Sequence, residues 1–178
     1  MSIDPDRTTI AVGRAVERLV AVARDRGRVA LATSRPASLL SCYSALADAL
    51  DDAGARVVDL GAYGPFHGSR SLWWVDGVAV VTDGSSLLAD DGLVAGGEWL
   101  FAIGRPDLLV CDRGFAAAGI GAGIETVALA DLDAVVLGVA ERRERPVRVV
   151  PLDEQRPPGA YDPLVEAFTG SLQACHQP

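Results

Sequence analysis

Short, uninterrupted apolar segments alternate along this chain with longer segments of helical periodicity, and this alternation restricts the fold more than any other feature. Arg28–Thr33 (RVALAT) and Asp107–Cys111 (DLLVC) are apolar segments of this kind, and each is followed at once by residues typical of a helix start. A strand that is apolar on both faces needs cover on both sides, which parallel sheets receive from their crossover helices. The chain is therefore predicted to be an α/β protein with a mostly parallel sheet.

The same patterns predict the individual elements. We expect strands at residues 28–33, 56–60, 107–111, 124–128 and 147–150, and helices at 5–26, 36–53, 97–103, 113–122, 133–143 and 161–172. Asp76-Gly77 is a strong turn signal between two β-rich segments, so Leu72–Val81 is predicted to be an inserted antiparallel hairpin. Ser34 is expected to cap the second helix. The expected fold is a single α/β domain over residues 1–178, a three-layer α/β/α sandwich whose Rossmann-like or flavodoxin-like sheet has about five strands.

Charge and composition exclude several classes of function. The formal net charge of −8 argues against a nucleic-acid partner, which a broad basic surface would attract. The longest apolar segments are shorter than the roughly 18 residues that a membrane helix needs, so no membrane partner is expected. The first ten residues lack the apolar core of a secretion signal, and three scattered cysteines fit a reducing compartment. These features together predict a cytoplasmic protein.

The residue types that are missing restrict the chemistry further. The chain contains no lysine and no asparagine, which excludes Schiff-base chemistry and a P-loop lysine. It has two histidines, His67 and His176, and no His/Cys pair with zinc-ligand spacing. A zinc enzyme is therefore not expected.

An anion site is predicted where the first and third parallel strands end. In open α/β sheets, ligands bind beyond the carboxyl ends of the strands, where the winding direction reverses. Helix N-termini supply N–H groups there, and arginines supply fork-shaped donors for phosphate or carboxylate. The candidate binding residues are Thr33, Ser34, Arg35, Ser38, Arg113 and Gly114. An alternative stays open, in which Arg35 pairs with a nearby carboxylate and Arg113 lies at the surface.

Carboxylates at the same edge are candidates for catalysis and for a metal. Asp112 and Asp131 each follow a predicted strand, and they could hold Mg²⁺ through oxygen ligands together with Asp133. Asp133 could instead cap the next helix. Asp112 and Asp131 are also the candidate catalytic residues. His67, in a predicted loop over residues 64–70, is a third candidate, as a general acid or base on a lid.

Three stretches carry a resemblance to known proteins. The stretches are ATSRPASLLSCYSALA, PDLLVCDRGFAAAGIGAGIETVALADLDAVVLGVA and the following VVPLDEQRPPGAYDP. They resemble a group of actinobacterial α/β proteins labelled "phosphatase". The resemblance implies a hydrolase acting on phosphate esters. In architecture the chain is also similar to sugar-phosphate isomerase domains. Of the phosphate-binding loop of those domains, only Ser34 and Ser38 have counterparts here. The S-X-S-G-X-[ST] spacing of that loop is missing, which argues against a phosphosugar substrate.

Three functions remain open at this point. The first is binding of a phosphorylated or carboxylated small metabolite, with metal-assisted hydrolysis of a phosphoester. The second is a non-catalytic phosphate-binding or carboxylate-binding module with a regulatory role. The third is a structural partner protein, and assembly with further copies of the chain is left open as well.

Overall fold

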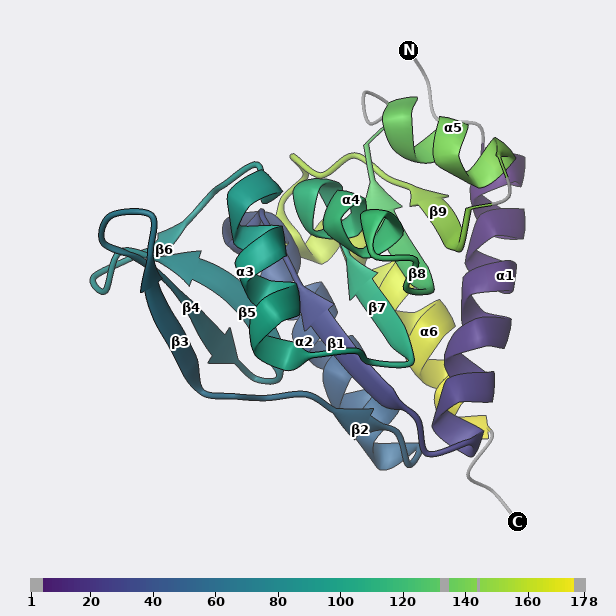
Figure 1. Ribbon diagram of the computed structural model, residues 1–178. Helices are drawn as coiled ribbons and strands as arrows, with labels where there is room; N and C mark the ends of the chain where they lie inside the picture. The colour runs from purple at the N-terminus through teal and green to yellow at the C-terminus, as the bar shows by residue number, and fades with distance from the viewer. Residues whose placement is uncertain (1–4, 132–134, 144, 175–178) are drawn as a thin grey trace.

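The computed structural model describes residues 5–131, 135–143 and 145–174, and a nine-stranded mixed sheet lies at the centre of these described residues (Figure 1). The strands are β1 (Arg28–Ala32), β2 (Arg56–Val57), β3 (Ala62–Phe66), β4 (Arg70–Val75), β5 (Val78–Thr82), β6 (Leu87–Leu88), β7 (Leu108–Cys111), β8 (Thr126–Ala130) and β9 (Val147–Pro151). Their order is β3-β4-β5-β1-β7-β8-β9, with β2 beside β1 and β6 beside β5. The predicted α/β class is confirmed.

The expectation of about five strands is wrong because β-rich residues between 62 and 88 extend the sheet. β1 pairs in parallel with β2, β5 and β7, and β7, β8 and β9 continue the parallel part. β3, β4 and β6 are antiparallel to their neighbours. The predicted hairpin is present as β4 and β5, and both of its turn residues, Asp76 and Gly77, have the positive φ that this turn needs.

Two strands share one edge of β1. β2 pairs with Arg28 and Val29, whereas β5 pairs with Leu31 and Ala32. The second predicted strand, at 56–60, is therefore only two residues long. Since β5 takes the half of the edge near the carboxyl end of β1, the hairpin lies beside that end.

Helices cover both faces of the sheet (Figure 1). They are α1 (Pro5–Arg24), α2 (Pro36–Asp52), α3 (Leu93–Ile103), α4 (Arg113–Gly121), α5 (Val135–Arg142) and α6 (Asp162–Ala174), and a 3-10 turn, η1 (Pro158–Tyr161), precedes α6. α1, α2 and α6 share one buried cluster with Val29 and Leu31, while α3, α4 and α5 share another with Ala30 and Ala32. Successive residues of one strand thus enter opposite cores, which explains the uninterrupted apolar runs.

The segment 64–70, predicted to be a lid loop, is mostly strand. Residues 64–66 belong to β3, Arg70 begins β4, and His67 lies in the turn between them with a φ of 40°. Pro65 hid this strand from the sequence pattern, but a proline is tolerated on a strand at the edge of a sheet. In the described ranges, no helix combines the length and apolar character that a bilayer span requires.

Candidate functional site

The carboxyl ends of β1 and β7 are adjacent, as the sequence predicts. The two strands pair in register from Val29 opposite Leu108 to Ala32 opposite Cys111. Thr33 and Asp112 follow directly, so the residues after β1 and those after β7 meet at one edge of the sheet. The helices α2 and α4 begin within a few residues of these strand ends, so both helix N-termini lie at this edge.

Asp112 joins the two strand ends. The Thr33 hydroxyl donates to its Oδ2 atom at 2.6 Å, and the Ser34 backbone N–H lies 2.9 Å from its Oδ1 atom. Asp112 occupies the N-cap position of α4 but makes no side-chain cap bond there. Ser34 is not the cap of α2 that the sequence predicted. Because Pro36 starts the helix, Arg35 is the N-cap residue, and the Arg35 side chain forms no cap bond.

Burial shifts the acidity of Asp112. The residue has no exposed surface, and this desolvation raises the pKa of the carboxyl from 3.8 to about 6, against the opposing effect of the Thr33 and Ser34 bonds. The nearby charge of Glu154 acts in the same direction as burial and is a smaller part of this shift. Asp112 therefore changes charge near neutral pH.

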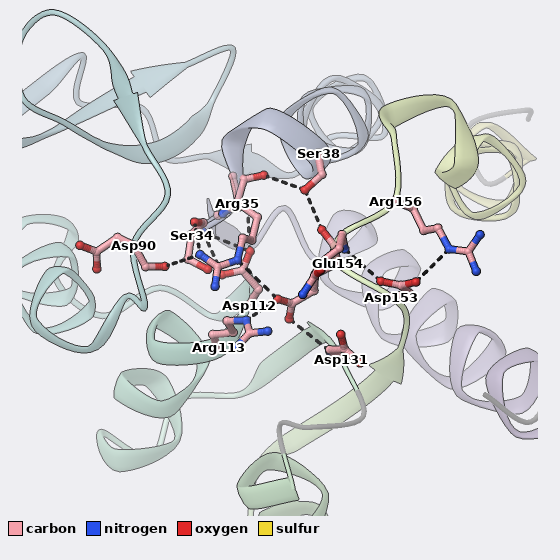
Figure 2. A network of polar contacts seen from close by, with 12 residues as sticks. Ser34, Arg35, Ser38, Asp90, Asp112, Arg113, Asp131, Asp153, Glu154 and Arg156 are labelled. Atoms are coloured by element: carbon pink, nitrogen blue, oxygen red, sulfur yellow. Dashed lines mark hydrogen bonds and ion pairs between the residues drawn. The ribbon is translucent and has the colours of Figure 1, made fainter. Parts of the chain in front are cut away.

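Glu154 is the centre of a second cluster (Figure 2). Arg113 donates from Nε to Glu154 Oε2, and Arg35 Nε lies 4.0 Å from the same oxygen. The Asp131 backbone N–H donates to Oε1 at 3.1 Å. The Glu154 side chain is completely buried, whereas the arginine side chains are 28% (Arg35) and 23% (Arg113) exposed. Two guanidinium groups thus reach the edge of the sheet around one buried carboxylate.

The backbone directs both arginines toward this point. Arg113 has a φ of 37°, an uncommon conformation for a residue with a side chain and one that concentrates at functional sites. Arg35 donates from Nη1 to the carbonyl oxygens of Asp90 at 3.2 Å and Ser34 at 3.4 Å. The Arg35 guanidinium is therefore held between the end of β1 and the segment before α3.

Asp90 connects the hairpin to the site. Its carboxylate accepts a bond from Arg70 Nη1 at 2.6 Å and one from the Gly92 backbone N–H at 2.7 Å. Its own N–H donates to the Ser34 carbonyl at 3.0 Å. The start of β4, the start of α3 and the end of β1 are thereby fixed to one another.

Two hydroxyl groups at this place have no hydrogen-bond partner among the described residues. They are those of Ser34 and Tyr43, and both residues have no exposed surface. Burial raises the pKa of the Tyr43 phenol well above its usual value, and the charges of Asp112 and Glu154 add to this shift. A buried hydroxyl without a partner is costly, so it marks a position where a ligand or water is expected to bind.

Most of the predicted site residues come together. Hydrogen bonds and ion pairs connect Thr33, Ser34, Arg35, Ser38, Asp112, Arg113 and Asp131 directly or through Glu154. Gly114 packs against the backbone of residues 91–93. His67 lies on the exposed turn between β3 and β4, and none of the described hydrogen bonds links it to the cluster. Asp133 lies outside the described residues.

Glu154 and Asp90 were missed by the sequence analysis. Glu154 stands three residues after β9 in a proline-rich link, and Asp90 precedes α3 in a glycine-rich stretch. The rule used for Asp112 and Asp131, that polar residues after parallel strands gather at one edge, applies to Glu154 as well. That rule could have identified Glu154. No local signal marked Asp90.

The two buried carboxylates at this edge already face hydrogen-bond donors. Both oxygens of Asp112 accept hydrogen bonds, and both oxygens of Glu154 face N–H donors. Within residues 5–131, 135–143 and 145–174 there is no group of three His, Cys, Asp or Glu side chains arranged to hold a metal ion. The Mg²⁺ site predicted from Asp112, Asp131 and Asp133 stays a prediction, since Asp133 lies outside the described residues.

A cavity of about 540 Å³ lies beside the site rather than in it. Its lining includes Val12 of α1, Val150 of β9, Tyr161 and Leu164, with Asp153 and Arg156 as its charged residues. Arg35 and Arg113 do not line it. The cavity and the arginine pair are thus separate features, although the segment that carries Glu154 lies between them.

Comparison with known proteins places the chain in a family. A family model described as Phosphatase matches residues 1–173. Phosphatase SCO2771 of Streptomyces coelicolor is 34% identical over 173 residues, which cover 92% of this chain and 64% of that protein. The chain thus spans less than two thirds of the length of this relative, and no solved structure matches it. The resemblance noted in the sequence is confirmed, and the chain belongs to the Phosphatase family.

Proposed function

We propose that the chain binds a small anionic metabolite between the N-termini of α2 and α4 and hydrolyses its phosphoester bond. The observation that carries the proposal is the convergence of Arg35 and Arg113 at the carboxyl ends of β1 and β7. Guanidinium forks and helix N-termini both favour phosphoryl oxygens. The expected Rossmann-like or flavodoxin-like sandwich binds ligands at this same edge. Membership in the Phosphatase family supports hydrolysis as the reaction.

The chemistry follows from the charges at this edge. Arg35 and Arg113 would neutralise the phosphoryl oxygens while a water oxygen attacks phosphorus. The ester oxygen leaves with the electron pair of the broken bond and takes a proton from solvent water, which gives the alcohol. Asp131, a half-buried residue whose backbone N–H bonds to Glu154, is the candidate whose carboxylate would orient that water and take its proton. Asp112 acts as a positioning residue, because its oxygens hold Thr33 and the Ser34 N–H.

A second candidate function is a non-catalytic anion-binding module. Two carboxylates at this edge favour it, because Asp112 is completely buried and both Glu154 oxygens already accept hydrogen bonds, so neither is placed to act on a substrate. Both functions share the anion site and differ in turnover. Separate measurements of binding and of hydrolysis therefore distinguish them.

Binding predicts a rise in melting temperature with phosphate. For a dissociation constant of about 1 mM, 20 mM phosphate adds about 1.8 kcal/mol of stability, or roughly 5 °C for a domain of this size. Arg113→Ala should remove most of this rise, because a charge-assisted pair to phosphate is lost. Arg156→Ala is the matched control, since Arg156 pairs with Asp153 outside the cluster. An equal rise in both variants, or none in the unmodified protein at tens of millimolar phosphate, would contradict the proposed site.

Hydrolysis predicts phosphate release from a generic aryl phosphate. Asp131→Asn should lower turnover about a hundredfold, which is the usual contribution of a general base. His67→Ala tests the remaining sequence-based candidate, and assays with Mg²⁺ and with EDTA test whether a metal takes part. If purified protein binds phosphate but releases none from a panel of phosphate esters in either medium, the binding-module function stands and the hydrolase does not.

A further inference from the structure

Glu154 occupies the position that an anionic ligand of this site would take. Its carboxylate faces Arg113 and Arg35, the two donors that the proposed function assigns to a phosphoryl group, and it also accepts a bond from the Asp131 N–H. A buried carboxylate costs several kcal/mol unless it is well paired. The chain therefore carries a carboxylate of its own at the point where an external anion would bind.

The backbone around Glu154 is anchored, so only its side chain is available to leave. The Ser38 hydroxyl of α2 donates to the Glu154 carbonyl at 2.7 Å, and the Tyr161 hydroxyl donates to the Asp153 carbonyl at 2.7 Å. These bonds tie the link to α2 and η1, and Figure 2 shows the bond from Ser38. Rotation of one side chain would expose both guanidiniums without moving the segment.

From this arrangement we infer that Glu154 is a built-in competitor: a ligand binds Arg35 and Arg113 only by displacing the Glu154 carboxylate. The inference rests on the anion site of the proposed function and adds a requirement to it. Moving the Glu154 carboxylate away from the arginines costs the same free energy whichever anion binds. The affinity of every anion is therefore lowered by one common factor. Only ligands with stronger intrinsic contacts than a carboxylate then bind well.

The class of ligand follows from this comparison. A carboxylate or a phosphodiester carries a single charge, as Glu154 does, and replaces it with no gain in charge. A phosphate monoester carries up to two charges and three terminal oxygens near neutral pH. The buried Ser34 hydroxyl, which has no partner among the described residues, is a further donor at the same edge. The site is therefore expected to select phosphate monoesters over phosphodiesters and carboxylates.

The test compares Glu154→Gln with the unmodified protein at pH 7.5, by calorimetric titration with inorganic phosphate, dimethyl phosphate and acetate. In the unmodified protein, phosphate should bind at least about tenfold more tightly than either monoanion, because a second charge strengthens the guanidinium contacts. In Glu154→Gln, all three ligands should bind about tenfold more tightly and by similar factors, since the common competitor is gone. Asp153→Asn is the control: it removes the same charge from the adjacent residue, which pairs with Arg156, and should leave affinities unchanged.

Two results would contradict this expectation. If Glu154→Gln binds phosphate more weakly while Asp153→Asn is unchanged, Glu154 orients the arginines and the inference is wrong, although the anion site stands. If none of the proteins binds phosphate, the proposed function fails. Should Glu154→Gln not fold, Glu154→Asp replaces it, because the shorter side chain weakens the contact with the arginines while keeping the charge. It too should then bind phosphate more tightly.

Discussion

Gly114→Ala is expected to lose about 3 kcal/mol or more of unfolding free energy. A Cβ atom at this position would lie 2.3 Å from the Asp91 carbonyl oxygen and 2.4 Å from the Leu93 nitrogen. These are backbone atoms at the start of α3, which cannot move aside as the end of a flexible side chain can. The Gly114 N–H also donates to the Asp91 carbonyl at 3.0 Å, so the two helices meet here through their backbones.

Gly97→Ala is the matched control for this prediction, and urea denaturation is the measurement. Gly97 lies within α3, and a Cβ there meets no described atom within 4 Å. Alanine should therefore stabilise the protein by roughly 0.5–1 kcal/mol through helix propensity. Since Arg113 immediately precedes Gly114, the Gly114→Ala variant should also lose its phosphate-dependent stabilisation. A Gly114→Ala protein as stable as Gly97→Ala would show that α3 and α4 do not approach so closely.

Asp112→Asn is expected to become progressively more stable than the unmodified protein as the pH rises from 4 to 7. The pKa of Asp112 is about 6 in the folded protein and 3.8 in its ordinary state, so folding favours the protonated form. The protonated Asp112 carboxyl therefore contributes fully to folding stability below pH 4, and this contribution is lost as the pH rises through 6. At about 1.4 kcal/mol per pKa unit, the loss is about 3 kcal/mol. Asparagine does not ionise, so the variant escapes this loss.

The measurement is the difference in unfolding free energy between the two proteins at several pH values. Using the difference removes the effect of groups that shift the other way, such as Asp83 and Asp153, whose pKa values are lowered by backbone hydrogen bonds. Those groups titrate equally in both proteins. A difference that stays constant from pH 4 to 7 would mean that Asp112 ionises alike in the folded and unfolded states.

Local sequence patterns were sufficient for much of the fold. The hairpin could be predicted because Asp76-Gly77 suits a turn with two positive φ angles, which few dipeptides do. The parallel strands β1 and β7 could be predicted because both are apolar on two faces, and their adjacency followed from the reversal of winding. The β3 strand could not, since Gly64 and Pro65 interrupt its pattern and only pairing with β4 makes it a strand.

The length of β2 depended on competition that no local pattern records. Arg56–Leu60 reads as a full strand, yet β5 occupies the half of the β1 edge that its last residues would need. Each backbone N–H and C=O group on one edge of β1 can bond to only one neighbouring strand. The hairpin therefore decided how long β2 could be.

The sequence by itself determined the edge of the sheet where the site lies, because the apolar runs, the helix starts and the arginines after them are all local features. Tertiary structure alone decided what those arginines face. Glu154 is 41 residues from Arg113 in the chain, and Thr33 is 79 residues from Asp112. Such pairs form because a buried charge needs an opposite charge or a hydrogen bond beside it, wherever in the chain that partner lies. That requirement acts in three dimensions, so it leaves no periodic signal in the sequence.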